Sequence, residues 1–591
     1  MSNVRTDLIP TPTLDSSLPR RLGDFATLTD ALDYAAKSKR GFNFYTARGE
    51  LKEVLSFADL RKRALAAAKK ISGYGLRPGE RVALIADTSP DFMAFFFGCQ
   101  CASVLPVPLP LPTSFGQREG YVAQLAQQMK SCGTSILIYP ALMHELAEQA
   151  AGEVKSIAFH GTNAQFFRAA SRDGELAPPR AQDLAYLQYS SGSTRFPHGI
   201  EITHKALMAN CHGIGAHGVQ VREDDRCISW LPFYHDMGLV GTLLASLSCQ
   251  VSTDFLATED FARRPLTWLH LMSRNKGTIT YSPTFGYDIC ARRVNEEALS
   301  SLDLSPWRIA GIGADMIRPD VMAAFAERFR SAGYRPTTFV PSYGLAECTL
   351  AVSFMPLDAG IQTDPVDERI LSGELTIEDI ENGPINGRAV AGSLTYREVV
   401  NCGKPLPQFT VEIRNDKGKV LPEKEIGRVF VKGDAVMQGY YNDPEATQAV
   451  LSANGWLDTG DMGYMKDGCI YIVGRVKDMI IINGKNHWPQ DIEWAVEQIP
   501  GVRSGDSAAI SVPGKSGEET PLVLVQCRFS DFEDRRKLAE QVKHIVQNIA
   551  GVGCDVALVP PRSLPHTSSG KLSRARARAQ YLAGQVQVLH A

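Results

Sequence analysis

YSSGSTRFPHGIEITH, residues 189–204, is the stretch of the chain that says most about its fold. A strand-like run, residues 184–189, comes before it, and Pro197 and Gly199 lead into a second strand-like run at residues 200–203. The five residues after Tyr189 are small, and four carry hydroxyls: Ser190, Ser191, Gly192, Ser193 and Thr194. A turn of this composition can bring backbone N–H groups and hydroxyls close to a polyphosphate.

This loop differs from a Walker P-loop. The Gly-Lys-Ser/Thr ending is missing, and a strand follows the loop where a Walker motif would have a helix. Taken alone, the stretch is equally consistent with an ordinary Ser/Gly turn, because short motifs often occur by chance. The other motifs of the chain decide whether this loop binds phosphate or is an ordinary turn.

Segments before the loop alternate between strand and helix patterns. Residues 81–86 (RVALIA) predict a buried strand, residues 89–102 a helix, and residues 121–132 another helix. Residues 135–139 and 156–159 are further strand candidates. This alternation predicts an α/β fold in which helices cover parallel sheets. Because such sheets bind ligands at the carboxyl ends of their strands, we expect chemistry in the loops that follow strands.

Length and composition describe an ordinary globular protein. The 591 residues suggest about four domain-sized units of ~150 residues. A net charge of -3 argues against a nucleic-acid partner, since phosphate backbones attract basic surfaces. The twelve cysteines are scattered, and only Cys99 and Cys101 lie close, in a spacing that does not fit a zinc site. We therefore expect reduced thiols in a cytoplasmic protein.

No membrane span is expected. The most apolar stretch, residues 92–98, is far shorter than the ~20 apolar residues that a bilayer requires. Residues 1–21 are polar and lack the pattern of a secretory signal.

Six further motifs follow the loop, in the order WLPFYHDMG (230–238), GIGAD (311–315), SYGLAE (342–347), WLDTGDMG (456–463), GRVKD (474–478) and SSGKL (568–572). Together with the loop they resemble the class I adenylate-forming enzymes, a superfamily of acyl-CoA synthetases, luciferases and peptide-synthetase adenylation domains. The resemblance covers nearly the whole chain. It departs in the loop, where the family usually has a lysine at the position of His198 and often a glycine at that of Arg195.

The resemblance implies roles for the charged residues of these motifs. Lys571 would be the main adenylation catalyst, since a lysine can neutralise charge that builds on a phosphoryl group in flight. His235 would lie beside the reacting carboxylate. Glu347 would hold Mg²⁺, which takes oxygen ligands close to the triphosphate. Lys477 and Asp478 would form the hinge about which a small C-terminal domain swings.

Other motif residues would bind ATP. The resemblance implies that Tyr343 stacks against the adenine and that the carboxylate of Asp461 accepts hydrogen bonds from both ribose hydroxyls. Arg475 would be a second ribose contact. The remaining nucleotide contacts would come from two loops, with residues Gly313, Ala314, Asp315, Ser342, Gly344 and Leu345. Each of these residues alone is more often a core or surface residue, so the assignment depends on the full set.

Several segments resemble one branch, the fatty acyl-AMP ligases. They are residues 230–241, 484–493 and 560–579, and the long unpatterned stretch at about 358–400 fits the insertion of that branch. The resemblance implies a large N-terminal domain of stacked α/β subdomains, residues 1–475, and a small mobile C-terminal α/β domain, residues 476–591. It also implies that a fatty acid is activated with ATP and Mg²⁺ and passed to an acyl carrier protein, with polyketide and non-ribosomal peptide synthases as candidate sources.

Alternatives remain at this stage. An acyl-CoA synthetase would share the fold and the first step, and a catalytically silent acyl- or nucleotide-binding protein would explain the changed loop at His198. An amino-acid substrate is disfavoured, because Asp236 is displaced from the position that peptide synthetases use.

Arg574, Arg576 and Arg578 predict one solvated face of a terminal helix. The alternative hypothesis is that these arginines form a docking surface for an acidic carrier protein. Met237, Phe285 and Tyr281 are candidates for the acyl pocket.

Overall fold

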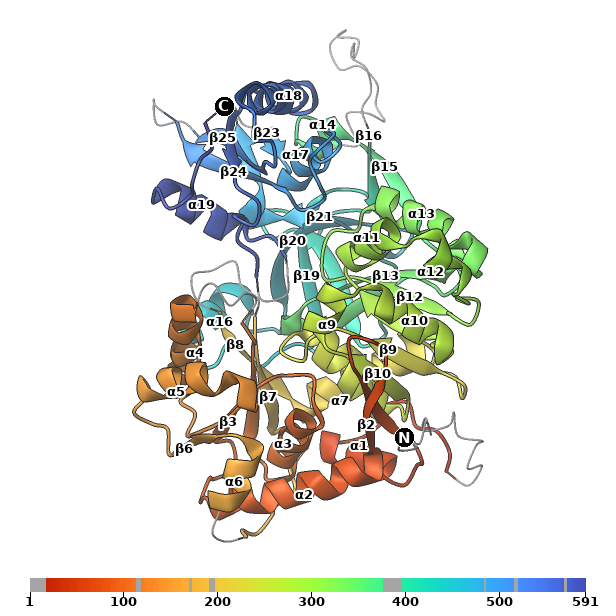
Figure 1. The fold of residues 1–591 in the computed structure, drawn as a ribbon, viewed down its shortest axis with the longest axis vertical. Coiled ribbons are helices and arrows are strands. Elements are labelled where there is room, and N and C mark those ends of the chain that lie inside the picture. Colours follow the sequence, from red (N-terminus) through yellow and green to blue (C-terminus); the bar gives the residue numbers. More distant parts are fainter. Residues whose placement is uncertain are drawn as a thin grey trace.

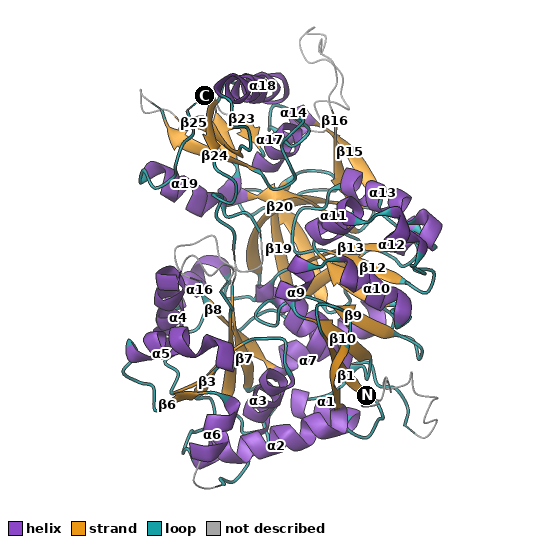
Figure 2. Ribbon diagram, in the orientation of Figure 1, coloured by secondary structure: helices purple, strands orange, loops and turns teal. Residues whose placement is uncertain are grey.

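A computed structural model describes residues 18–112, 118–169, 173–190, 197–375, 396–482, 485–514, 519–567 and 571–590. Within these residues the strands form seven sheets, and helices cover the faces of the larger ones (Figures 1 and 2). The predicted α/β class is confirmed. The first and last segments of the described chain lie at opposite ends of the view in Figure 1.

The largest sheet has nine strands and is parallel through its middle. Its order is β17 (Lys404–Pro405), β14 (Ala351–Phe354), β13 (Phe339–Gly344), β12 (Ile309–Ile312), β11 (Ile279–Ser282), β9 (Arg226–Ser229), β10 (Ser252–Leu256), β1 (Gly41–Tyr45) and β2 (Leu51–Ser56). Every residue of β9, β10, β11 and β12 is buried. Because both faces of these strands are covered, their residues do not alternate between buried and exposed.

Helices pack on both faces of this sheet. They are α1 (Leu28–Ala35), α7 (His204–His212), α8 (Ala245–Ser248), α9 (Thr258–Arg263), α10 (Leu266–Arg274), α11 (Thr284–Arg293), α12 (Glu296–Ser300) and α13 (Pro319–Arg328). Figure 1 shows α10 to α13 along the outer side of the sheet.

A second sheet is wholly parallel, with the order β4 (Leu105–Leu109), β3 (Arg81–Ile85), β5 (Ile136–Ile138) and β6 (Phe159–Gly161). Its helices are α2 (Phe57–Gly73), α3 (Pro90–Cys101), α4 (Arg118–Cys132), α5 (His144–Gly152) and α6 (Asn163–Ala169). The predicted strand at 156–159 was placed too early: β6 begins where it was expected to end. The residues directly before Phe159 instead form a turn and a bend.

Helix α3 is buried from Phe92 to Gln100. The Ser89 hydroxyl accepts a hydrogen bond from the Phe92 amide and caps the helix, and Pro90 occupies its first turn. A Cβ at Gly98 would lie 2.8 Å from the Cβ of Ala67 on α2, so glycine is needed where the two helices cross. The predicted buried helix is therefore present and packs closely on α2.

Strands β7 (Leu184–Tyr189) and β8 (Gly199–Thr203) flank the Ser/Gly loop and pair antiparallel. Most of that loop, residues 191–196, lies outside the described residues. Next to β8 runs the segment before α16 (Pro444–Val450), and the Tyr441 amide donates to the Gly199 carbonyl at 2.7 Å. An antiparallel sheet of β18 (Phe409–Arg414), β19 (Gly427–Gly433), β20 (Leu457–Lys466) and β21 (Cys469–Arg475) follows.

The C-terminal elements form a separate cluster at the top of Figure 1. They are β22 (Ile480–Ile482), β23 (Lys485–His487), α17 (Pro489–Val496), β24 (Ser507–Pro513), β25 (Glu519–Gln526), α18 (Phe532–Ala550), β26 (Asp555–Val559) and α19 (Arg574–Leu582). They share a core that includes Val496, Val523, Val542 and Leu558. The short turn Val476–Asp478 connects this cluster to β21, so the predicted domain boundary at 475/476 falls where β21 ends.

Two expectations for the remaining chain need correction. The stretch 358–400 contains more structure than its pattern indicated, since β15 (Thr363–Asp367) and β16 (Tyr396–Val400) pair antiparallel and α14 (Glu368–Leu371) follows β15. The tail arginines do not form one solvated face. Arg574 makes ion pairs with Glu493 and Asp478, and Arg578 donates to the Ser511 carbonyl, while Arg576 is exposed.

None of the helices in the described part of the chain is long and apolar enough to cross a membrane.

Candidate active site

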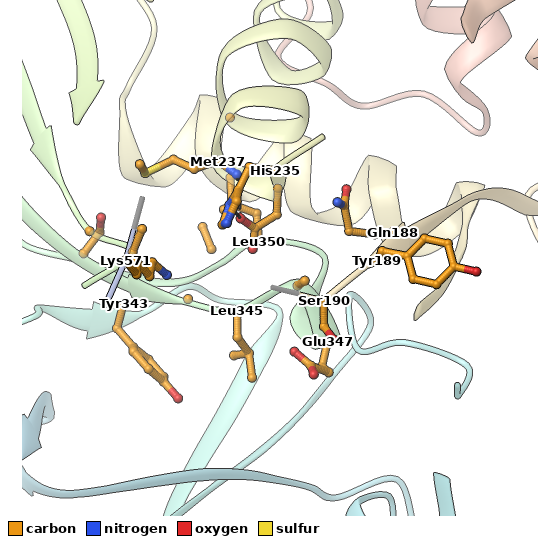
Figure 3. Close-up of a pocket in the computed structure, with 18 of the residues that line it drawn as sticks. Gln188, Tyr189, Ser190, His235, Met237, Tyr343, Leu345, Glu347, Leu350 and Lys571 are labelled. Carbon is orange, nitrogen blue, oxygen red and sulfur yellow. Dashed lines mark hydrogen bonds and ion pairs between the residues drawn. The ribbon is translucent and has the colours of Figure 1, made fainter. Parts of the chain in front are cut away.

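A cavity of about 360 Å³ lies where the large sheet, β7–β8, α16 and the C-terminal cluster meet (Figure 3). It brings together predicted residues from motifs that are far apart in the sequence: Ser190, His235, Gly313, Ala314, Ser342, Tyr343, Gly344, Leu345, Glu347, Arg475, Lys477 and Lys571. In Figure 3, Ser190 and Glu347 lie towards one end of the cavity, and Lys571 and Tyr343 towards the other.

Other predicted residues do not line the cavity. Asp461 lies directly behind Tyr343, and Asp478 pairs with Arg574 away from the cavity wall. Asp315 is exposed, and its carboxylate accepts a hydrogen bond from the Met316 amide. The predicted phosphate-loop residues Ser191, Gly192, Ser193 and Thr194 lie outside the described residues.

Tyr343, Asp461 and Arg475 form one hydrogen-bonded unit. The Tyr343 hydroxyl donates to Oδ2 of Asp461 at 2.7 Å, and Nε of Arg475 donates to Oδ1 at 3.1 Å. Burial, together with the Asp461 charge, raises the pKa of Tyr343 well above its ordinary value. The Asp461 charge likewise raises the pKa of Arg475. The Tyr343 phenol therefore stays protonated and the Arg475 guanidinium stays charged. Their two hydrogen bonds hold the Asp461 carboxylate in place from two sides.

The SYGLAE motif was predicted to lie in a loop after a strand. In the structure its first three residues instead belong to the strand β13. Ser342, Tyr343 and Gly344 are the last residues of β13, and Gly344 pairs with β14. A Cβ at Gly344 would lie 2.0 Å from the Leu350 carbonyl oxygen, so only glycine allows this close approach. The strand thereby holds Tyr343 at the cavity wall.

Glu347 offers an oxygen ligand for a metal. It lies in the helical turn Ala346–Cys348, and its Oε1 accepts a hydrogen bond from the Tyr440 hydroxyl at 3.0 Å. Among the described residues no group of three or more His, Cys, Asp or Glu side chains could hold a metal ion. A single carboxylate is enough for a Mg²⁺ ion that takes its other ligands from phosphate groups and water. It is not enough for a metal site whose ligands all come from the protein.

Lys571 reaches the cavity from the C-terminal cluster. Its loop is closed by backbone hydrogen bonds, with the Thr567 amide donating to the Lys571 carbonyl at 2.7 Å. Burial lowers the pKa of Lys571, and the charge of Arg475 lowers it further, whereas Asp315, Asp236 and Asp461 raise it. Lys477, also at the cavity, has its pKa lowered by burial and by Arg475. Anionic ligands would offset the repulsion among these cations.

His235 lies at the start of the helical segment Met237–Leu244. Its Nδ1 is 2.8 Å from Oδ1 of Asp236, and that oxygen also accepts the Met237 amide at 2.7 Å. Burial alone would raise the pKa of Asp236, but its hydrogen bond and ion pair with His235 lower it below the ordinary value. Nε2 of His235 is buried and has no partner among the described groups. It is available to a ligand in the cavity.

The apolar part of the cavity could hold a hydrocarbon chain. Its walls include Met237, Gly241, Tyr281, Leu350 and Phe354. The candidates Met237 and Tyr281 therefore line the cavity. Phe285 does not, since its side chain is 39% exposed and its ring packs edge-on against Trp230.

Several residues that line the cavity belong to none of the seven motifs. Gln188 lies in the buried strand β7 and donates to the Tyr234 carbonyl at 2.9 Å. Tyr440 belongs to a Gly-Tyr-Tyr run whose aromatic and glycine content could have marked it as a close approach. Ala446 and Val450 line the cavity from α16, where small apolar residues look like any helix face.

Similarity to known proteins identifies the family of this chain. Residues 34–441 match the family of AMP-binding enzymes. A Caulobacter vibrioides (strain NA1000 / CB15N) protein with the provisional name acyl-CoA synthetase is 46% identical over 98% of this chain and 99% of its own length. The medium-chain-fatty-acid–[acyl-carrier-protein] ligase JamA of Moorena producens (strain JHB) is 32% identical over 95% of this chain and 96% of its own.

A solved structure from work on fatty acyl-adenylate ligases of E. coli and L. pneumophila aligns with a TM-score of 0.89 and 44% identity. The alignment covers 96% of this chain and 99% of that one. The chain therefore belongs to the AMP-binding enzymes and, within them, to the fatty acyl-AMP ligases, which use ATP to activate a fatty acid as its acyl adenylate.

Proposed function

We propose that this enzyme forms a fatty acyl-AMP with Lys571 as its main catalytic residue and then transfers the acyl group to the phosphopantetheine thiol of an acyl carrier protein. The observation that carries the first step is the meeting of Lys571 with His235, Glu347 and the Tyr343–Asp461–Arg475 unit around one cavity. The C-terminal cluster and the large body thus contribute to the same site.

In the first half-reaction a carboxylate oxygen attacks the α-phosphorus of ATP. A new P–O bond forms, the bond from the α-phosphorus to the bridging oxygen breaks, and pyrophosphate leaves with the bonding electrons. Lys571 neutralises the charge that develops on the α-phosphoryl oxygens, and His235 holds the carboxylate in line for attack. Mg²⁺, when held by Glu347 and phosphate oxygens, would offset charge on the triphosphate.

In the second half-reaction the carrier thiolate attacks the acyl carbonyl. A thioester forms and AMP leaves. The turn Val476–Asp478 connects the two parts of the chain, and rotation about Lys477 and Asp478 would move Lys571 away and admit the thiol.

The choice of a carrier protein over free CoA is supported by contacts between the insertion and the C-terminal cluster. Nε1 of Trp488 donates to the Leu371 carbonyl at 3.1 Å, and Arg397 pairs with Asp491 at 3.1 Å. Val366, Leu371, Val399 and Trp488 share one apolar core with Tyr464 and Val473. These contacts oppose free movement of the cluster, so a bound protein partner would be needed to compensate their loss.

The test mixes the protein with MgATP and fatty acids of graded chain length and follows acyl-AMP by mass spectrometry. Free CoA, or a carrier protein with and without its phosphopantetheine arm, is then added. Discharge onto the modified carrier alone supports the proposal. Discharge onto CoA would make the enzyme an acyl-CoA synthetase, the alternative that the name of the Caulobacter relative favours. Absence of acyl-AMP with every acid would refute the first step.

A further inference from the structure

Two glutamates one helical turn apart, Glu493 and Glu497, lie in α17 and directly after it. Glu493 pairs with Arg574 at 2.6 Å, and Arg574 is three residues from Lys571 in the sequence. The Glu497 amide donates to the Glu493 carbonyl at 2.9 Å, so the helical turn continues through both residues. Whatever binds Glu497 is therefore connected through one rigid turn to the segment that carries Lys571.

Glu497 pairs with an arginine of the large body. Nη1 of Arg318 donates to Oε2 of Glu497 at 2.7 Å, and the two side chains are only 9% and 6% exposed. Oε1 of Glu497 accepts the Gly505 amide at 2.7 Å, which fixes the carboxylate within the cluster. Burial raises the pKa of Glu497 to about 7, and the Gly505 hydrogen bond and the Arg318 charge counter part of this shift. The ion pair is thus a buried contact between the two parts of the chain, where loss of one partner leaves the other uncompensated.

Arg318 is fixed by the large body as well. It directly precedes α13, and its Nη2 donates to Oδ2 of Asp320 at 2.9 Å. Its guanidinium also lies over the indole of Trp494 on α17, with 5.5 Å from Cζ to the ring centroid. A cation over an aromatic face adds to the attraction between the arginine and the helix. One guanidinium therefore contacts both the large body and two residues of the cluster.

The loop that carries Arg318 lies beside Lys571. Burial lowers the pKa of Lys571, and the charge of Asp315, three residues before Arg318, gives the largest opposing effect. Because such an effect fades with distance, the loop from Asp315 to Arg318 faces the Lys571 segment.

We propose that Arg318 is a positioning residue for acyl-AMP formation, which through Glu497 seats α17 on the large body and so brings Lys571 to the cavity. The inference rests on the proposed function for the role of Lys571. Arg318 is not among the described residues that line the cavity, so it acts through the cluster and not on a substrate. Rotation about the hinge would separate Arg318 from Glu497, so the pair favours the first half-reaction only.

The experiment measures both half-reactions at pH 8 in Arg318→Gln, Arg318→Lys, Glu497→Gln and the double variant Arg318→Gln/Glu497→Gln. Pyrophosphate exchange reports the first step, and single-turnover transfer from supplied acyl-AMP reports the second. In either single Gln variant kcat for exchange should fall about tenfold, because a buried charge-assisted hydrogen bond is lost. The KM for ATP and the transfer rate should each change by less than about twofold, since no substrate contact is removed.

Two of these variants show whether the pair itself matters. Arg318→Lys keeps the charge and should recover most of the lost rate. The double variant should be no slower than either single variant, since both changes remove one interaction. It also leaves neither charge unpaired, so it tests the proposal even if a single variant loses its thermal transition.

Trypsin cleavage after Lys477 gives a readout that does not depend on activity. Lys477 lies in the turn between the two parts of the chain and lines the cavity, so release of the cluster should expose it. Cleavage should be about fivefold faster in Arg318→Gln and Glu497→Gln than in the wild-type protein. Arg328→Gln is the matched control, because Arg328 on α13 pairs with Glu296 at 2.7 Å within the large body. It should match the wild-type protein in both rates and in cleavage.

Equal losses in both half-reactions, or unchanged exchange and cleavage in the Gln variants, would overturn the inference. A wild-type protein that makes no acyl-AMP, while the Gln variants still speed cleavage after Lys477, would refute the proposed function and leave the seating contact supported. Acyl-AMP formation that is indifferent to Arg318 and Glu497 would refute the positioning role alone.

Discussion

Nη1 of Arg574 donates a hydrogen bond to Oδ2 of Asp478 at 3.1 Å. Arg574 lies three residues after Lys571 in the sequence. The same guanidinium makes two bonds to Glu493, at 2.8 and 2.6 Å. Glu493 and Arg574 both belong to the C-terminal cluster, whereas Asp478 lies in the turn that joins the cluster to the large body. The loop of Lys571 is thereby tied to the proposed hinge.

Asp478→Asn should slow acyl-AMP formation about tenfold, because it weakens a charge-assisted hydrogen bond that holds the Lys571 loop. Transfer from supplied acyl-AMP should slow much less, since rotation about the hinge would part this pair in any case. Pyrophosphate exchange and single-turnover transfer measure the two steps. Asp534→Asn, an exposed change on α18, is the control. Equal losses in both steps would contradict this account.

Lys571→Ala should reduce acyl-AMP formation by about 10²–10³-fold, since it removes the cation proposed to meet the α-phosphoryl charge. The thermal transition should stay close to that of the wild type, because Lys571 lines the cavity and its truncation leaves no new void in an apolar core. Lys543→Ala, an exposed lysine on α18, should leave the rate unchanged. A loss below threefold would assign the catalytic charge to another residue.

Tyr343→Phe should raise the KM for ATP about three- to tenfold with little change in kcat. The change removes the hydrogen bond that holds Oδ2 of Asp461 and leaves the ring in place. Tyr334→Phe is a matched control, because Tyr334 is also buried but its hydroxyl has no partner among the described groups. If both variants behave alike, the Tyr343 hydroxyl has no part in nucleotide binding.

Gly241→Leu should shift the acid preference to shorter chains. A Cβ at Gly241 would lie 3.1 Å from Cδ2 of Leu350, and a larger side chain would fill the apolar part of the cavity. We expect at least a tenfold loss of kcat/KM for the longest accepted acid and a small change for short acids. Gly152→Leu, whose Cβ would meet nothing within 4 Å, is the control. A uniform loss across all acids would instead indicate general disruption.

Asp87, just after β3, should make stability depend on pH. Burial raises the pKa of its carboxyl to about 6, although the Ser89 hydroxyl lowers it. The folded protein then binds the proton more tightly than the unfolded chain, so stability falls as pH rises from about 4 to about 6 and stays lower above that range. Asp87→Asn removes this loss.

The variant should therefore exceed the wild type by roughly 1–3 kcal/mol at pH 8 and match it near pH 4, measured by urea unfolding. Asp555→Asn, an exposed change, should show no such difference. A pH-independent gain would point to a packing effect of the amide.

The sequence predicted those features of the fold and the site that depend on residues close together in the chain. The run of small residues from Ser190 and the buried strand before it gave β7 and β8 nearly to the residue, because strand pattern and turn composition depend on neighbours in the chain. The seven motifs gave the superfamily for the same reason. Strand boundaries were predicted less accurately where apolar residues continue beyond the strand, as Ile157 and Ala158 do before β6.

Relations between distant residues depended on the tertiary fold. No pattern in the tail distinguishes Arg574 from Arg576, yet one is paired with Glu493 and Asp478 and the other is exposed. Similarly, Asp443 is an ordinary helix cap in sequence and becomes the partner of His198 only because the segment before α16 runs beside β8. Local pattern reports which elements form, whereas the pairing of charges across elements follows from how their surfaces pack, which no short stretch of sequence encodes.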